Sequence, residues 1–346
     1  MASLIELDSL EVQVLVDNEV DPISTYEHPG IAVSGQLRDV GLKTPLDESS
    51  RGGAKLEIRL DNVCCGAHGL SLMITGVKDS QRRTVLFDTA PEELIWELNV
   101  NRLRADIASI EWVQLSHWHR DHSGGMLKAI SMIQKAKSSK EGLTVDLHPD
   151  RPTYRGIATP NGIVSLERDP TWEEIEATGA KVEKHSQTHA ILDGHFLVSG
   201  EIPRVTAYEP GVLRGVKYDD KTHTWEKDEL ILDERFLMCK VKGYVFALSN
   251  KGLVVFTGCS HAGVVNVVKH ALSLAGEATP LYAVVGGYHL VGPNEAFIKE
   301  TVQDLKALNP QILMPGHCSG WRAKHEIANV LPGRLAPSTV GTKFVF

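Results

Sequence analysis

An apolar run that ends abruptly in His117-Trp118-His119-Arg120-Asp121-His122 is the most constraining feature of this chain. In an extended segment, residues two apart point to the same side, so His117 and His119 can face one point. Asp121 and His122, at the turn that follows, can face a second point beside it. Neutral imidazoles and carboxylates are ligands of zinc, iron and manganese. This order of residues therefore predicts a metal site at the end of a strand, in preference to histidines that merely fill space.

Length and composition are those of an ordinary globular protein. The chain has 346 residues, of which 42% are hydrophobic and 23% charged, which is enough to bury a large core. We expect a single domain over residues 1–346, with residues 137–235 inserted into it as a cap segment. The net charge is −8 and no basic stripe stands out, so we expect no nucleic-acid partner.

The first residues and the cysteines bear on where the protein acts. The start of the chain has neither the charged nor the apolar region of a secretory signal, and no apolar run is long enough to cross a bilayer. Five scattered cysteines, odd in number, favour a reducing compartment. We therefore expect a cytoplasmic protein with a small-molecule substrate and no membrane partner. The oligomeric state stays open, with a homodimer as one option.

Other apolar runs predict how the chain alternates between strands and helices. A first hairpin is expected from two strands around a charged turn at 78–81, and a second from 244–248 and 253–257. Residues 217–229 are heavily charged and predict a surface loop. The further strands expected on either side of these features are 10–17, 109–115, 281–285 and 311–314. The histidines between residues 185 and 223 are interpreted as surface or structural residues: His185, His189, His195 and His223.

Several predicted strands stop at a glycine-containing turn that carries a histidine. Besides the pair His117 and His119, these turns carry His261, His289 and His317. Loops at strand ends can meet on one edge of a layered sheet, where rigid elements position their side chains. We therefore expect these histidines to converge, although each turn by itself could be only a tight turn with a polar cap.

The H-x-H-x-D-H run resembles the metal motif of the metallo-β-lactamase superfamily. Further segments are similar to one branch of it, that of the dihydropterin ribofuranosylaminobenzene-phosphate synthase of archaeal methanopterin synthesis. The resemblance covers roughly residues 10–335 and implies an α/β (α+β layered) αββα sandwich with a two-metal site at one edge. The segments that carry it are His68–Ser71, Leu86–Thr89, Ser116–Gly125, Gly200–Arg204, Gly258–Gly263, Gly286–Leu290 and Gly316–Cys318.

Most of the ligand set follows from this resemblance. His117, His119, Asp121 and His122 match the family motif position for position, and His317 matches its final histidine. The slot for a bridging or second-metal ligand, usually Asp and sometimes Cys, holds Cys259 in Thr257-Gly258-Cys259. Whether Cys259 is a thiolate ligand or a buried bystander stays open.

The chain departs from the family at one ligand position. No histidine stands about two dozen residues upstream of Cys259, before the second hairpin, where the segment reads Asp233-Glu234-Arg235-Phe236. We expect His261 to complete the first metal instead. His289 is expected in preference as a catalytic group that faces the substrate, either a proton donor or an oxyanion partner, and its alternative roles as a metal ligand or as support for one stay open. Asp88 is expected to accept a hydrogen bond that orients the metal-binding loop.

The resemblance also implies the chemistry. Members of the superfamily typically hydrolyse β-lactams, lactones, thioesters or phosphodiesters. We expect two divalent ions, zinc first and iron or manganese as alternatives, to activate water, with Asp121 ligating and orienting the nucleophile. The favoured substrate is a small cyclic amide, carbamate or ester of the lactam or lactone type. The alternatives are a phosphate-ester or pterin-precursor enzyme, for which no Gly-rich phosphate cradle is visible, and a non-catalytic metal or ligand binder.

Overall fold

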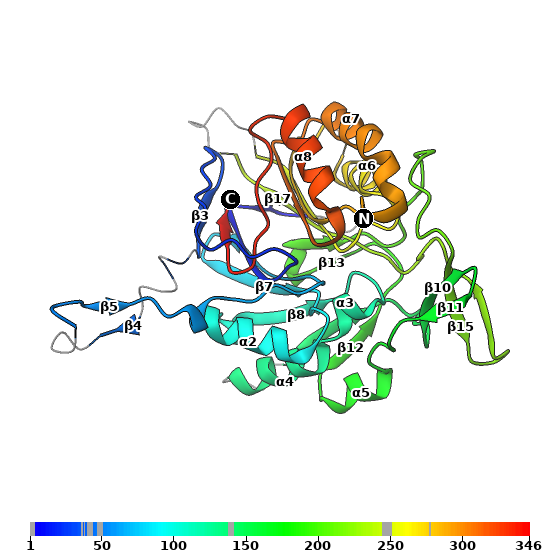
Figure 1. Cartoon of the computed structure of the whole chain (residues 1–346), viewed down its shortest axis with the longest axis horizontal. Helices are drawn as coiled ribbons and strands as arrows, with labels where there is room; N and C mark the ends of the chain where they lie inside the picture. Colours follow the sequence, from blue (N-terminus) through cyan, green and yellow to red (C-terminus); the bar gives the residue numbers. More distant parts are fainter. Residues whose placement is uncertain are drawn as a thin grey trace.

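The computed structural model describes residues 4–35, 37, 39, 44–46, 51–137, 142–243, 251–276 and 278–346. Two β-sheets lie face to face, and each carries helices on its outer side, so the chain forms the four layers of an αββα sandwich (Figure 1). The expected fold class is confirmed. None of the helices described is long and apolar enough to cross a membrane.

The first sheet has eight strands and is built mainly from the N-terminal half of the chain. Partly exposed and buried residues alternate along most of β2 (Ser9–Val16), which is the pattern of a strand that packs one face against the core. The predicted hairpin around residues 78–81 is confirmed as the antiparallel pair β6–β7. The strands, in sheet order, are β12 (Lys181–Lys184), β9 (Thr144–Leu147), β8 (Ile110–Gln114), β7 (Gln81–Phe87), β6 (Ser71–Lys78), β2 (Ser9–Val16), β21 (Lys343–Val345) and β3 (Ala32–Ser34).

The second sheet has seven strands and is built mainly from the C-terminal half. Its strands β18, β19 and β20 are parallel to one another, so their C-terminal ends lie on the same edge. Of the second predicted hairpin, 253–257 forms β18, whereas 244–248 and the first half of the turn lie outside the described residues. The strands in order are β13 (His189–Ile191), β14 (Phe196–Val198), β17 (Leu237–Val241), β18 (Leu253–Thr257), β19 (Leu281–Gly287) and β20 (Ile312–Gly316), with β1 (Glu6–Leu7) beside β17.

Helices cover the outer face of each sheet, and three apolar clusters hold the layers together. One cluster fills the space between the sheets, and the other two lie between a sheet and its helices. The helices on the first sheet are α2 (Glu93–Leu103), α3 (Arg120–Ser123), α4 (Met126–Ala136) and α5 (Trp172–Ala177). Those on the second are α6 (Val264–Ala275), α7 (Ile298–Leu308) and α8 (Trp321–Val330). Short 3-10 turns lie at Leu60–Asn62, Ile107–Ser109, Leu192–Gly194, Gly292–Phe297 and His317–Ser319.

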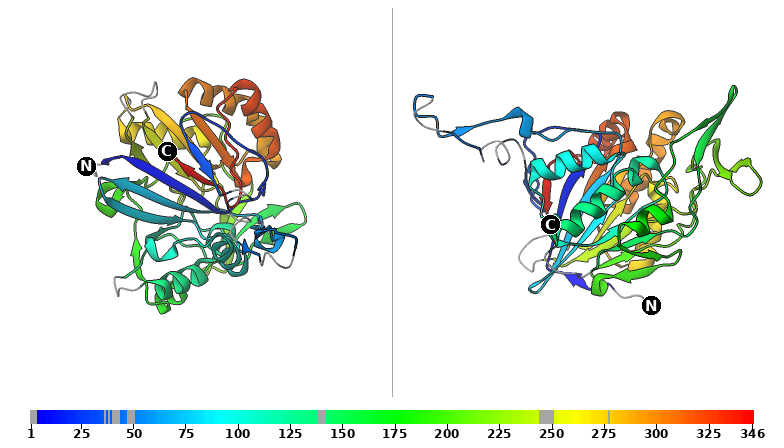
Figure 2. Two further views of the ribbon diagram at one scale, coloured as in Figure 1. Left: turned by 90° about the vertical axis from the view of Figure 1, so that its left-hand side faces the viewer. Right: turned by 90° about the horizontal axis from the view of Figure 1, so that it is seen from below.

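A small four-stranded sheet projects from the sandwich, and we call it the outer sheet (Figure 2, right). The prediction of a surface loop at 217–229 is wrong, because this segment forms most of a hairpin within that sheet. Its strands are held by a cross-strand pair of rings, Tyr218 opposite Trp225, whose centroids lie 5.5 Å apart. In order, the strands are β11 (Gly162–Ser165), β10 (Arg155–Thr159), β15 (Gly215–Asp219) and β16 (Thr224–Lys227).

The segment 137–235 does more than form the outer sheet. Its described residues also supply β9 and β12 to the first sheet and β13 and β14 to the second. The division of the chain into one domain with an inserted cap stays a prediction. A separate two-stranded hairpin, β4 (Thr44–Pro45) with β5 (Leu56–Glu57), extends from the opposite end of the molecule (Figure 2, right).

Gly124, between α3 and α4, allows the metal-motif segment to pass close to a neighbouring loop. A Cβ atom at this position would lie 1.7 Å from the Pro91 carbonyl oxygen, so one of the two backbones would have to move. We predict that Gly124→Ala lowers the free energy of unfolding by about 1–3 kcal/mol, measured by chemical denaturation. Gly142→Ala is the control, since nothing lies within 4 Å of its added Cβ. Equal stability of the two variants would contradict this account.

Candidate metal centre

The ends of three strands and one short helix deliver the predicted ligands to one edge of the sandwich. β8 leads into His117 and His119, and α3 carries Asp121 and His122. The loop after β18 and the turn after β20 supply the rest. The structure thus brings all the predicted ligands together, and we call them the donor cluster: His117, His119, Asp121, His122, Cys259, His261 and His317.

Three imidazoles form the first part of the donor cluster. His117 Nε2 and His119 Nδ1 lie 2.9 Å apart, and His261 Nε2 lies 3.1 Å from the same His119 atom. His261 thus stands beside the H-x-H pair although 142 residues separate it from His119. Its predicted role in completing the first metal is compatible with this position and stays a prediction.

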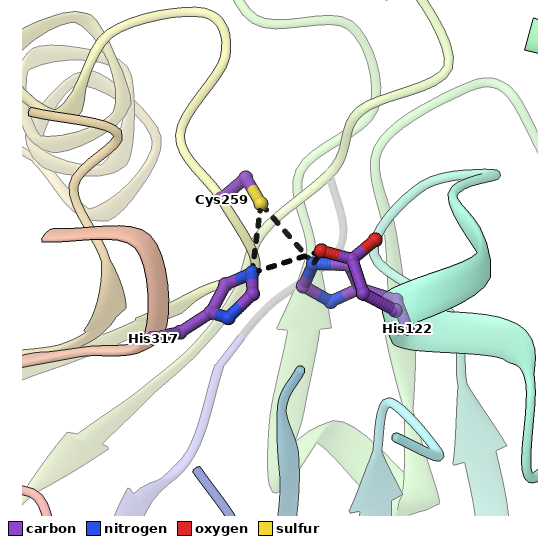
Figure 3. A group of neighbouring side chains, drawn as sticks. His122, Cys259 and His317 are labelled. Carbon is purple, nitrogen blue, oxygen red and sulfur yellow. Dashed lines mark hydrogen bonds and ion pairs between the residues drawn. The ribbon is translucent and has the colours of Figure 1, made fainter. Parts of the chain in front are cut away.

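The second part contains a carboxylate, two imidazoles and a thiol. Cys259, His122 and His317 point toward one another from the loop after β18, from α3 and from the turn after β20 (Figure 3). Cys259 Sγ lies 3.1 Å from His122 Nε2 and 3.2 Å from His317 Nε2. Asp121 Oδ2 is 3.2 Å from the same His317 atom and 3.7 Å from His122 Nε2. The Cys259 thiol also belongs to a group with His117 and His261, so it lies between the two parts.

The spacing and the chemistry of these atoms fit divalent ions. Ligands about 2.1 Å from a tetrahedral ion lie roughly 3.4 Å from one another, close to the separations of 2.9–3.7 Å in the donor cluster. Burial lowers the pKa of His119 to about 3, helped by the charge of Arg155, so this imidazole is neutral as a ligand must be. Burial also acts to lower the pKa of His122, but the carboxylates of Asp88 and Asp121 outweigh it and raise the pKa to about 9. The second part therefore favours a positive charge.

Buried carboxylates hold the backbone of each turn that carries ligands. Asp88 accepts from the N–H of Ser116 at 2.7 Å and Asp17 from the N–H of His317 at 2.7 Å. Asp88 also lies 2.6 Å from His122 Nδ1, which confirms the expected hydrogen bond and leaves Nε2 to face the cluster. These carboxylates are fully buried, so their lost hydration is replaced by these bonds.

The segment where the family would place its middle histidine contains two more such carboxylates. Asp233 accepts from the N–H of Trp118 at 2.7 Å. Glu234 accepts from the N–H groups of His261 and Ala262 at 2.7 and 2.6 Å. These bonds tie the H-x-H turn and the His261 turn to one segment, so the departure from the family supplies support for ligands instead of a ligand.

Arg235, the next residue, fixes the end of β8. Its guanidinium donates to the Leu115 carbonyl at 3.1 Å and to Asp146 Oδ1 at 2.9 Å. Asp146 also meets His189 Nε2 at 2.6 Å and His185 Nδ1 at 3.4 Å, which makes a second cluster of ligand types. Because the buried charge of Arg235 already neutralises Asp146, we interpret this cluster as a structural ion network, in line with the sequence-based interpretation of both histidines.

Two residues beside the donor cluster were not among the predicted ligands. Cys318 forms a further group with Cys259 and His289, and His68 Nε2 lies 3.7 Å from Asp121 Oδ2. Both occupy segments that carry the family resemblance. His68 directly precedes Gly69, and Cys318 lies two residues after Gly316, in the turn that carries His317. His289, predicted as catalytic, packs its ring 4.3 Å from that of His261, and its Nδ1 has no hydrogen-bond partner among the described residues.

The donor cluster lies at the bottom of an open cavity of about 690 Å³. His119, Asp121, Cys259 and His261 line this cavity together with His289. The opposite wall comes from the outer sheet and from the loops beside it. A volume of this size is typical of sites for small molecules.

The bond between Asp88 and His122 gives a test that does not depend on a substrate. In Asp88→Asn the side chain loses its negative charge and one of its two acceptor oxygens. It can then no longer accept hydrogen bonds from both Ser116 and His122. We predict a metal affinity about 10- to 100-fold lower, measured by competition with a chelator. Asp79→Asn is the control. Asp79 has a positive φ of 52°, similar to the 60° of Asp88, so the same substitution meets a similar backbone conformation, but Asp79 lies in the exposed β6–β7 turn. Equal affinities in the two variants would show that Asp88 does not support a ligand.

Comparison with known proteins agrees with the architecture. No family model matches the chain. A crystal structure of a metal-dependent hydrolase of the β-lactamase superfamily aligns over 96% of this chain and 98% of its own, with a TM-score of 0.64 and 21% identity. The 7,8-dihydropterin-6-methyl-4-(β-D-ribofuranosyl)-aminobenzene-5'-phosphate synthase of Methanocaldococcus jannaschii is 27% identical over 266 residues, 75% of this chain and 83% of the synthase. An uncharacterized protein of the same organism is 27% identical over 265 residues, 76% of this chain and 88% of its own. The resemblance predicted from the motifs is confirmed: the chain has the metallo-β-lactamase fold, with His, Asp and Cys clusters suited to divalent metal, and is similar in sequence to this archaeal synthase.

Proposed function

We propose that this protein is a metal-dependent hydrolase of a small cyclic amide, carbamate or ester, of the lactam or lactone type. The observation that carries the proposal is the position of the donor cluster, because four of its seven residues line an open cavity: His119, Asp121, Cys259 and His261. Structural metal sites use up their ligands internally, whereas catalytic sites keep a face open to substrate. Two ions, zinc first, are the expected complement.

The two parts of the donor cluster divide the ligands between the ions. His117, His119 and His261 would hold one ion, and Asp121, His122 and His317 the other, with the Cys259 thiol next to both. When bound, such ions supply an activated water at neutral pH and positive charge beside the scissile bond.

Two residues of the chain then act on the substrate itself. The Asp121 side chain is 24% exposed toward the cavity, so its carboxylate can accept a hydrogen bond from the attacking water and orient it. His289 lines the same cavity, next to the ring of His261. It is therefore placed to give a proton to the leaving nitrogen or oxygen, or to donate to the developing oxyanion.

The similar archaeal synthase suggests a second candidate, an enzyme of phosphate esters or pterin precursors. Its name specifies a phosphorylated molecule, and phosphate is usually met by free arginine or lysine side chains. Among the residues described around the cavity, Arg155 is paired with Asp228 and Asp233, and Arg120 lies 3.5 Å from Glu167. The part of the substrate that lies beside Arg155 and Arg120 is therefore expected to be uncharged. A non-catalytic binder is the third candidate, and turnover of any substrate would exclude it.

Removal of one ligand should remove metal and activity together. We predict that His119→Ala retains less metal by elemental analysis and loses activity roughly a hundredfold or more, since a direct ligand should matter at least as much as its support. His325→Ala, on the exposed face of α8, is the matched control and should behave as wild type. Wild-type metal content in His119→Ala would rule out the ligand assignment.

The substrate class is tested by a panel of lactams, lactones, thioesters and phosphodiesters, assayed with zinc-loaded protein and again after treatment with a chelator. We predict turnover of a lactam or lactone that the chelator abolishes and added zinc restores. Turnover of phosphodiesters alone would favour the second candidate and contradict the first.

A further inference from the structure

We propose that the outer sheet binds an uncharged aliphatic or aromatic substituent of the substrate, next to the bond that is cleaved. The inference rests on the proposed function, because it assigns the reactive group to the donor cluster. It adds the chemical class of the rest of the substrate and the residues that select it.

Apolar side chains of the outer sheet and of the loops beside it line the cavity together with the donor cluster. Ile157 and Leu166 line the cavity and are 44% and 41% exposed, so each leaves a large apolar surface in contact with water. Val216 and Val291 line the same cavity. Apolar surface of this extent, continuous with a set of polar reactive groups, is typical of a pocket that covers the unreactive part of a ligand.

The register of β10 places Ile157 on the same side of the outer sheet as the ligand-bearing turn. Residues two apart on a strand share a face, so Ile157 lies on the same face as Arg155, whose guanidinium meets the turn that carries the ligands. On the β15 side, Ile157 lies opposite Gly215, which has no side chain to cover it, whereas on the β11 side it lies opposite Val164. The space beside Ile157 is therefore open to a ligand and lies on the side of the donor cluster.

The buried guanidinium of Arg155 fixes the outer sheet to the segment that carries the ligands. Arg155 donates to the Trp118 carbonyl at 2.8 Å and to Asp228 Oδ2 at 2.7 Å, and it also pairs with Asp233. Trp118 stands between the two histidines of the H-x-H motif, so the same buried guanidinium holds the wall and the ligand-bearing turn. A substituent that fits the wall thus has a defined position relative to the donor cluster.

The charged groups around the cavity disfavour an anionic substituent. Both guanidinium groups described around the cavity face carboxylates, as noted above, while Glu92 and Glu167 also line it. An anionic substituent would find carboxylates and no free cation at this wall. An uncharged substituent loses little hydration when it binds there and gains from covering Ile157 and Leu166.

The test uses lactones of one ring size with an alkyl substituent lengthened one methylene at a time. With the metal-loaded enzyme, kcat/KM should rise about three- to fourfold per methylene until the wall is covered. In Ile157→Asp the rise should fall to less than twofold per methylene. Ile163→Asp is the matched control, because Ile163 is 43% exposed on the neighbouring strand β11 and does not line the cavity. Ile163 pairs with Ala158, so its side chain lies on the other face of the sheet from Ile157, and the variant should keep the wild-type rise. Leu166→Ser serves as a second variant if Ile157→Asp does not fold by circular dichroism.

A binding measurement separates this inference from the proposed function. Straight-chain carboxylates of increasing length are titrated into the metal-loaded protein by calorimetry, and their affinity should rise per methylene in wild type and Ile163→Asp but not in Ile157→Asp. If no lactone is hydrolysed while this dependence is present, the proposed function fails and the apolar wall stands. Affinity and kcat/KM that do not change with chain length, or an equal loss in Ile163→Asp, would overturn the inference.

Discussion

Buried carboxylates that accept backbone N–H groups are the interaction on which the rest of the site depends. Asp17, Asp88, Asp233 and Glu234 are at most 2% exposed, and each accepts from the backbone of a turn that carries predicted ligands. A buried carboxylate without partners costs several kcal/mol. The turns and the carboxylates therefore stabilise one another, and the imidazoles are positioned before any ligand arrives.

The same interactions give the site its electrostatic character. Burial acts to raise the pKa values of Asp121 and Asp233, but the charges of His122 and Arg155 outweigh it and lower both, while burial lowers the pKa values of most of the nearby histidines. This edge of the sandwich therefore holds carboxylate charge beside neutral imidazoles. Only part of that charge is balanced by arginine, since Arg155 pairs with Asp233, whereas Asp121 lies beside His122 and His317. Divalent cations are the natural complement, which connects the arrangement of the carboxylates to the proposed hydrolytic chemistry.

Much of this site could be predicted from the sequence because its signals are local. The H-x-H-x-D-H run lies within six residues, and each remaining ligand follows an apolar strand and a glycine. Parallel strands end on one edge, so the convergence of β18 and β20 followed from the strand pattern. Of the supporting carboxylates, Asp88 was expected from its place in a resembling segment, whereas Asp17, Asp233 and Glu234 gave no such signal. Asp17 meets His317 across 300 positions of sequence, and only the folded chain brings them together.

The outer sheet shows the opposite case. Its charged hairpin at 217–229 was predicted as a loop, because charged residues at most positions hide the alternation of a strand. The strands are stable here because Tyr218 and Trp225 pair across them and because β15 adds to β10, contacts that no local pattern reveals. The consequence is functional, since this sheet forms the wall that the cavity presents to a substrate.

The presence of bound cations at the donor cluster is the central claim, and anomalous X-ray diffraction tests it most directly. Crystals of the zinc-loaded protein, measured on both sides of the zinc absorption edge, should show two anomalous peaks. One is expected among His117, His119 and His261, and the other among Asp121, His122 and His317. The absence of any peak at the donor cluster, or a peak only beside Asp146, would contradict the account.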